Sequence, residues 1–139
     1  MSAPYDFKRI TPSVYGDKRP VEGETLALLH IAFDDRGLKL IETKSRTVRL
    51  NEVHELMITD EAAEPGGRAD RVRAICFFEI TKSGLIVVGD DVWIEDRLLG
   101  NLAGYDMTHM PNHMNIVVNS SSLDEPDLRV GEKIKFVKG

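Results

Sequence analysis

Apolar and polar residues alternate over short stretches of this chain, and turn residues separate the stretches. Residues 114–119 place Met114, Ile116 and Val118 on one face, and a similar alternation runs through residues 133–137. Strict alternation is typical of a half-buried β-strand. About eight or nine such segments follow one another, and none has a convincing helical spacing. The pattern therefore predicts an all-β domain, or nearly so, folded as a single small barrel or sandwich.

Two apolar segments, residues 25–33 and 38–43, flank a turn signal at residues 34–37. Apolar segments on both sides of a turn predict a β-hairpin. In residues 71–80 the even-numbered positions from 72 to 78 are apolar and are predicted to share one face. Apolar residues also occur on the other face of that segment, which predicts a central strand or a barrel strand.

Two further segments could be read as helix or strand. Residues 53–58 fit a strand or a short helix capped by Asn51, and we favour the strand because no helix C-cap follows. Residues 97–106 contain Gly100 and Gly104, and each glycine inside a helix would cost about 1 kcal/mol against alanine. We therefore predict strand and turn for this second segment.

Proline, glycine and charge set the remaining boundaries. Residues 1–24 are polar and interrupted by proline and glycine, which predicts an N-terminal arm with one short strand around residues 7–10. Residues 59–70 are acidic and then contain Pro-Gly-Gly, so we expect an exposed loop with no packed element there. Residues 25–139 are expected to form the single barrel-like domain.

Residues 85–94 consist of an apolar strand, the Gly89-Asp90 turn and an alternating strand. This segment resembles the Gly-Asp box of cradle-loop and related small β-barrels. The resemblance implies a barrel fold and no particular active site, because such barrels serve as transcription regulators, enzymes and passive modules. Residues 128–136 repeat the pattern with Gly131-Glu132, where glutamate replaces the aspartate of the box.

The composition excludes several classes of protein. The chain has 139 residues, one cysteine, and 18 basic against 23 acidic residues, for a net charge of −5. No intrachain disulfide can form, and a cytoplasmic location is expected. The acidic balance argues against a nucleic-acid partner, because phosphate binding depends on lysine and arginine. No apolar run approaches the roughly 18–20 residues of a membrane span, so no membrane partner is expected.

Side chains that can carry chemistry are concentrated between residues 104 and 115. Core packing does not require so many hydrogen-bonding groups, and serine, lysine and glutamate would suffice for a loop that only had to be soluble. The candidate site residues in this stretch are Tyr105, Asp106, Thr108, His109, Asn112, His113 and Asn115.

A first interpretation is a metal site. His109 and His113 would supply imidazole nitrogens to Zn²⁺, Fe²⁺ or Mn²⁺, with Asp106 as a carboxylate ligand. A complete site needs more ligands, for which the candidates elsewhere in the chain are His30, His54 and Glu55.

A second interpretation is acid–base catalysis on a small polar metabolite. His109 and His113 would transfer a proton while Asp106 fixes the tautomer of one ring. The ligand would then be oriented by the neighbouring polar side chains of Tyr105, Thr108, Asn112 and Asn115.

A third interpretation is structural. Asp106 and Thr108 would hydrogen-bond turn backbone, and residues 111–112 would form a turn. The three methionines of the stretch, Met107, Met110 and Met114, would pack beneath it as adaptable filler.

Four other residues have simpler interpretations. Cys76 lies between apolar neighbours and is expected to be buried and unreactive. Trp93 is expected to anchor the core or a subunit interface. His30, inside an apolar run, is expected to lie in the core or lumen, and His54 at the surface.

Two classes of function follow from these residues. The first is a non-catalytic ligand-binding or assembly module, and the second is a small metal-assisted or His-dependent lyase, isomerase or hydrolase with its pocket around residues 105–115. The two classes differ in whether His109, His113 and Asp106 face a common cavity. Near-continuous apolar strands, together with Trp93 and the methionines, also predict a homo-oligomer.

Overall fold

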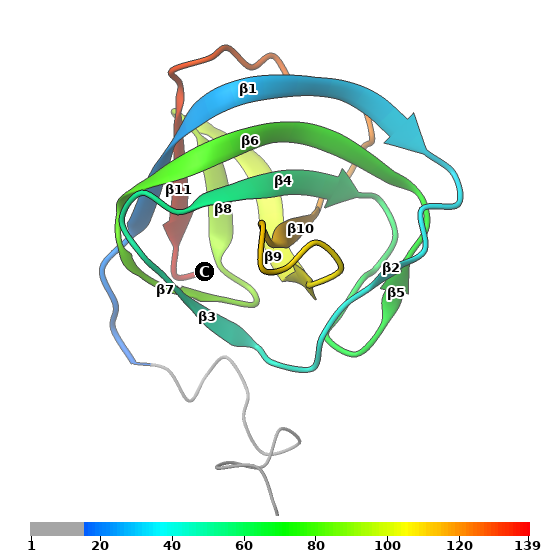
Figure 1. The fold of residues 1–139 in the computed structure, drawn as a ribbon, viewed down its shortest axis with the longest axis horizontal. Helices are drawn as coiled ribbons and strands as arrows, with labels where there is room; N and C mark the ends of the chain where they lie inside the picture. The colour runs from blue at the N-terminus through cyan, green and yellow to red at the C-terminus, as the bar shows by residue number, and fades with distance from the viewer. Residues whose placement is uncertain (1–15) are drawn as a thin grey trace, which may run out of the picture.

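Seven strands of the protein form a closed barrel, and four short strands form two additional sheets (Figure 1). The computed structural model describes residues 16–139, so the strand predicted around residues 7–10 lies outside the described residues. The eleven strands are β1 (Val21–Phe33), β2 (Leu38–Lys39), β3 (Ser45–Val48), β4 (Val53–Thr59), β5 (Arg68–Ala69), β6 (Val72–Lys82), β7 (Gly84–Val87), β8 (Asp91–Ile94), β9 (Arg97–Asp106), β10 (Asn115–Asn119) and β11 (Lys133–Val137).

The barrel follows the order β1-β11-β8-β9-β10-β4-β6 and closes through the pairing of β6 with β1. All neighbours are antiparallel except β10 and β4, which run parallel. The connection from β10 to β11, residues 120–132, therefore carries the chain away from β4 and into the gap between β1 and β8. The all-β barrel predicted from the alternation is confirmed, with eleven strands in place of eight or nine.

Residues 85–94 were predicted to form two strands around a Gly-Asp turn, and β7, β8 and the turn between them are present. The backbone N–H of Asp90 donates to Val87 O, and Asp90 Oδ2 accepts the Val87 N–H at 2.9 Å. Gly89 has a φ of 95°, a backbone conformation that glycine adopts without a steric penalty. The turn is also paired with the neighbouring strand β9, because Leu102 N–H donates to Asp90 O.

Two other turns have the same bonding pattern. In residues 129–132, Glu132 Oε1 accepts the Arg129 N–H at 2.7 Å, and Gly131 has a φ of 91°. In residues 49–52, Glu52 Oε1 accepts the Arg49 N–H at 3.1 Å, with a φ of 72° at Asn51. Glutamate thus replaces aspartate without loss of the turn, and asparagine can replace glycine because it tolerates a positive φ.

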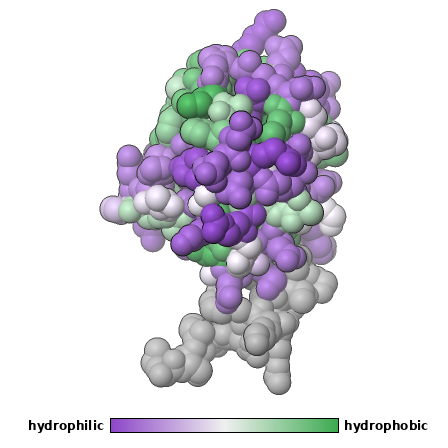
Figure 2. All heavy atoms as spheres, turned by 90° about the vertical axis from the view of Figure 1, so that its right-hand side faces the viewer, coloured by the Kyte–Doolittle hydropathy of each residue, from purple (hydrophilic) through white to green (hydrophobic). Residues whose placement is uncertain are grey.

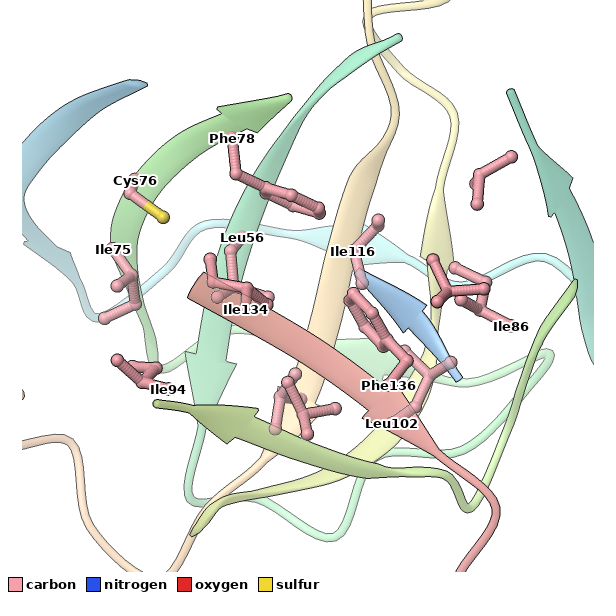
Figure 3. Packing of buried hydrophobic residues seen from close by; sticks show 14 of the residues in the cluster. Leu56, Ile75, Cys76, Phe78, Ile86, Ile94, Leu102, Ile116, Ile134 and Phe136 are labelled. Carbon is pink, nitrogen blue, oxygen red and sulfur yellow. The ribbon is translucent and has the colours of Figure 1, made fainter. Parts of the chain in front are cut away.

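The barrel interior is filled by apolar side chains from all seven strands (Figure 3). Ile134 and Phe136 of β11 are fully buried there, as their shared face predicted. Met114, Ile116 and Val118 also point into this core, which confirms the alternation of that segment.

A second core lies on the outer side of the barrel. Leu38 and Leu40 pack against Met57, Ala103 and neighbouring side chains that point outward from the barrel strands. The hairpin predicted between residues 25–33 and 38–43 is therefore wrong: β1 pairs with β6 and β11, and β2 pairs with β5. Because the chain leaves the barrel here, Leu38 of β2 and the adjacent Leu40 cover the outer wall of the barrel.

Strand β6 contributes to both cores, because its register shifts against β1 and β4. Val72 and Ala74 belong to the outer core, whereas Ile75, Cys76 and Phe78 belong to the interior. The prediction that the even-numbered positions from 72 to 78 share one face is wrong for this reason, since a bulge moves the residues beyond it to the opposite face.

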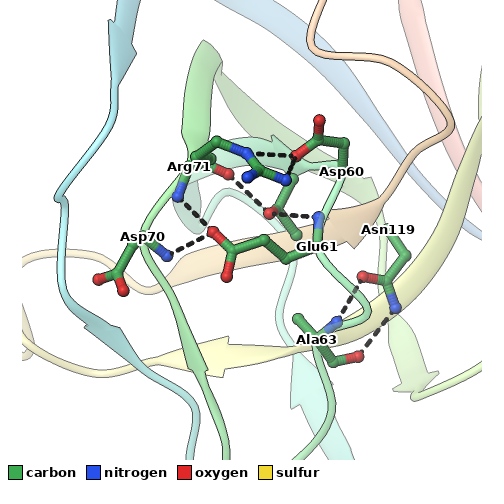
Figure 4. A network of polar contacts seen from close by, with 7 residues as sticks. Asp60, Glu61, Ala63, Asp70, Arg71 and Asn119 are labelled. Carbon is green, nitrogen blue, oxygen red and sulfur yellow. Dashed lines mark hydrogen bonds and ion pairs between the residues drawn. The ribbon is translucent and has the colours of Figure 1, made fainter.

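The loop after β4 is held in place by a polar network (Figure 4). Glu61 Oε2 accepts the backbone N–H groups of Asp70, at 2.9 Å, and of Arg71. Asn119 exchanges two hydrogen bonds with the backbone of Ala63, at 2.9 and 3.1 Å. Residues 59–70 were expected to contain no packed element, but they include β5 and bury Ala63 and Ala69 in the outer core.

Candidate functional site

The structure divides the predicted site residues into two groups. Tyr105, Asp106 and Asn115 lie at the ends of β9 and β10 and are at most 1% exposed. The connection between these strands, residues 107–114, is called the β9–β10 loop below. Its tip, residues 108–112, is exposed, and it includes the predicted residues Thr108, His109 and Asn112.

Tyr105 is part of the barrel interior. Its hydroxyl hydrogen-bonds to the backbone carbonyl of Ile86 at 3.1 Å and to that of Lys44 at 3.3 Å. These contacts tie β9 to β7 and to the segment before β3. With no exposed surface, the Tyr105 side chain cannot touch a ligand at the loop tip.

Asp106 is the first anchor of the β9–β10 loop. Its Oδ1 accepts the Thr108 N–H at 2.9 Å and the Asn115 amide at 3.3 Å, and its Oδ2 accepts the Lys39 N–H at 3.0 Å. Burial alone would raise the pKa of Asp106, but the hydrogen bonds from Thr108, Lys39 and Asn115 outweigh it and lower the pKa below its ordinary value. The Asp106 carboxylate therefore accepts hydrogen bonds from two backbone N–H groups and from Asn115, and it does not orient a histidine.

His54 is the second anchor, at the other end of the loop. Its Nδ1 accepts the Met114 N–H at 3.0 Å, and its Nε2 lies 3.0 Å from Glu52 Oε1. The side chain is buried, so the prediction of a surface position for His54 is wrong. The alternation of side chains along β4 directs His54 beneath the loop, where its ring accepts the buried backbone N–H of Met114.

The two histidines of the loop lie against one another. The rings of His109 and His113 stack with 5.0 Å between their centroids. The Phe77 ring lies nearly perpendicular to the His113 ring, with 5.1 Å between their centroids. Arg36 Nη2 lies 3.3 Å from His109 Nε2, and the Arg36 guanidinium also lies 5.6 Å from the centre of the Phe33 ring. The two histidines lie together, as the metal interpretation requires. Arg36, which lies beside them, is not predicted from the sequence.

His113 also meets a carboxylate, which is Glu55 and not Asp106. Its Nε2 lies 3.3 Å from Glu55 Oε1, and the two side chains are only 12% and 13% exposed. The geometry of this contact is not that of a hydrogen bond, so the buried Nε2 has no hydrogen-bond partner among residues 16–139. The sequence predicts Glu55 only as a further candidate metal ligand, because alternation in β4 does not reveal which loop packs over it.

Metal ligation requires several donors around one point. Among residues 16–139, no group of three or more histidine, cysteine, aspartate or glutamate side chains is placed to hold a metal ion. A metal at His109 and His113 therefore stays a prediction. Asp106 is poorly placed to serve as its carboxylate ligand, since its oxygens already accept three hydrogen bonds.

Two other predictions concern single residues. Cys76 is buried as expected, and burial raises the pKa of its thiol to about 12, so the reactive thiolate is scarce at neutral pH.

His30 was expected in the core or lumen, but its side chain is 65% exposed and contacts Glu125. In β1 the register shifts between residues 28 and 31, which turns His30 outward.

One face of the protein is mostly polar. The face in Figure 2 is dominated by hydrophilic residues, with small separate apolar areas. Among residues 16–139 we find no helix that is long and apolar enough to cross a membrane.

Trp93, expected as a core or interface anchor, is half-buried on β8. The homo-oligomer stays a prediction.

Comparison with known proteins identifies a family. A family model described as "Family of unknown function (DUF6917)" matches residues 15–137. No curated protein and no solved structure matches the chain.

Proposed function

Because this chain belongs to a family of unknown function, its role has to be inferred from its own residues, and we propose that it is a non-catalytic binding module. The ligand would bind at the tip of the β9–β10 loop, beside Arg36, and would carry a carboxylate or phosphate group. The observation that carries this proposal is the anchoring of an exposed loop by buried polar side chains.

The anchors require a physical explanation, because burying a polar group costs free energy unless it is hydrogen-bonded. Asp106 and Asn115 fix the start of the loop, and His54 fixes its end. A connection that only had to be soluble could be short and exposed, with no buried polar support. Holding residues 108–112 in one conformation lowers the entropy that a ligand would otherwise lose on ordering them.

The chemistry at the tip favours an anion. Arg36 forms no ion pair with any carboxylate among residues 16–139, and one of its N–H groups is directed at His109 Nε2. A guanidinium presents five donors in a planar fork that matches carboxylate and phosphate oxygens. When His109 accepts from Arg36 at Nε2, its neutral ring carries the proton on Nδ1 as a further donor. The exposed amide of Asn112 adds donors on the same loop.

The proposal is tested by titrating the ¹⁵N-labelled protein with sodium phosphate and with sodium acetate at constant ionic strength. We expect saturable amide shifts in the β9–β10 loop with at least one of the two anions. Arg36→Gln should weaken that affinity by at least about tenfold, because a charge-assisted hydrogen bond is lost.

Arg49→Gln is the matched control, since Arg49 is an exposed arginine on a turn after β3. It should leave the affinity unchanged. Absence of loop shifts with both anions, or equal affinities for wild type and Arg36→Gln, would overturn the proposed anion site.

A His-dependent enzyme is the second candidate, and the contact between His113 and Glu55 favours it. A nearly buried carboxylate 3.3 Å from an imidazole nitrogen can orient the ring for proton transfer or complete a metal site.

Metal analysis by mass spectrometry of untagged protein separates the two candidate functions. Stoichiometric zinc, iron or manganese that is lost in the His109→Ala/His113→Ala variant supports the enzyme, whereas metal-free protein that binds anions at the loop supports the module.

A further inference from the structure

A pocket of about 190 Å³ lies between β1, β6 and the segment 120–132 that leads into β11. In Figure 1 this segment passes behind β1 before it enters β11. Five of the residues that line the pocket are apolar: Leu28, Leu29, Ile75, Pro126 and Leu128. Ile75 and Leu128 also belong to the barrel core, so this part of the wall is fixed by the packing of the fold.

Two acidic side chains and one histidine are the polar side chains of this pocket. Glu125 and Asp127 line it together with His30. His30 Nδ1 contacts Glu125 Oε1, and the Glu125 side chain remains 46% exposed. Asp127 is 83% exposed, and its carboxylate lies 3.8 Å from Arg97. The pocket therefore combines apolar side chains with two carboxylates that a ligand can reach.

We propose that this pocket binds a small organic cation, a primary ammonium group attached to an apolar body about the size of one aromatic ring. An apolar cavity of about 150 Å³ accommodates benzene, so a pocket of this volume can hold a ring and a short chain. The ammonium group would pair with Glu125, in place of His30, and would lie near Asp127. A carboxylate in the same place would meet two like charges at close range.

This site is independent of the β9–β10 loop. The two sites share no residue, and they have opposite charge preferences: an arginine with histidines at the loop, and two carboxylates at the pocket. The proposal can therefore fail while the anion site holds, and the reverse also applies.

The test is a titration of the full-length ¹⁵N-labelled protein with phenethylammonium chloride, with 3-phenylpropanoate as a probe of similar shape and opposite charge. We expect saturable amide shifts in residues 28–30 and 125–128 with the ammonium compound and at least about fivefold weaker binding of the carboxylate. Glu125→Gln should weaken the ammonium affinity about three- to tenfold, the modest range expected for a partly exposed ion pair.

Asp124→Asn is the matched control, because Asp124 is an exposed acid of the same segment that does not line the pocket. It should leave the affinity unchanged, and both variants should retain the wild-type melting temperature within about 2 °C, since both positions are exposed surface sites. Equal binding of the two probes, equal affinity of wild type and Glu125→Gln, or shifts confined to other residues would overturn the proposal.

Discussion

Asp106→Ala is expected to destabilise the protein by about 3 kcal/mol, because it leaves buried hydrogen-bond donors without an acceptor. The carboxylate is 1% exposed and accepts N–H groups from Lys39, Thr108 and Asn115. Asp106→Asn keeps one oxygen as an acceptor and should lose about half as much. The measurement is urea denaturation at pH 7 for the wild type and both variants.

The contribution of Asp106 to the free energy of unfolding should decrease as the pH falls. The folded pKa of Asp106 is lowered, so its contribution is fully present above the unfolded value, about 3.9, and is lost as the pH falls through the folded pKa. The difference in unfolding free energy between wild type and Asp106→Asn should therefore shrink between pH 5 and the acid limit of folding. A difference that stays constant over this interval would show that the charge of Asp106 does not stabilise the fold.

Asp90→Ala is expected to cost about 3–5 kcal/mol, the range for breaking a buried ion pair by removing one partner. Asp90 Oδ2 lies 2.9 Å from Lys18 Nζ, and the two side chains are only 3% and 10% exposed. The substitution leaves the Lys18 ammonium without its counter-charge and the Val87 N–H without its acceptor. Thermal and urea denaturation measure the loss.

Glu132→Ala is the matched control for Asp90→Ala. Glu132 occupies the same place in the turn of residues 129–132, but its side chain is 24% exposed and pairs with the exposed Arg97. We expect it to cost about 1 kcal/mol. Lys18→Met combined with Asp90→Ala should be milder than Asp90→Ala alone, because no charge is then left buried. Equal losses for Asp90→Ala and Glu132→Ala would contradict a role for the buried pair.

Much of the fold could be predicted from local patterns. Alternation placed Ile116, Val118, Ile134 and Phe136 in the core, and the glycine before Asp90 marked a turn that the structure contains. These features depend on neighbours in sequence. The pairing of β1 with β6, and the bulge that turns His30 outward, depend on the closure of the barrel, which a single sequence does not encode locally.

The candidate site was predicted only in part for the same reason. The density of polar residues from 104 to 115 marked the segment in which the two histidine rings stack. Composition could not separate the buried anchor Asp106 from the exposed His109. Arg36 lies 73 residues from His109 in sequence, and no local signal connects them.

We expect the buried acceptors to hold the β9–β10 loop in one conformation before any ligand binds, and amide hydrogen exchange measures this. The N–H groups of Thr108 and Met114 donate to Asp106 and His54. In the wild-type protein without ligand, both should exchange at least about 100-fold more slowly than in an unstructured peptide. Exchange of both groups at the unstructured rate would contradict the account, because the loop would then open freely in the unbound protein.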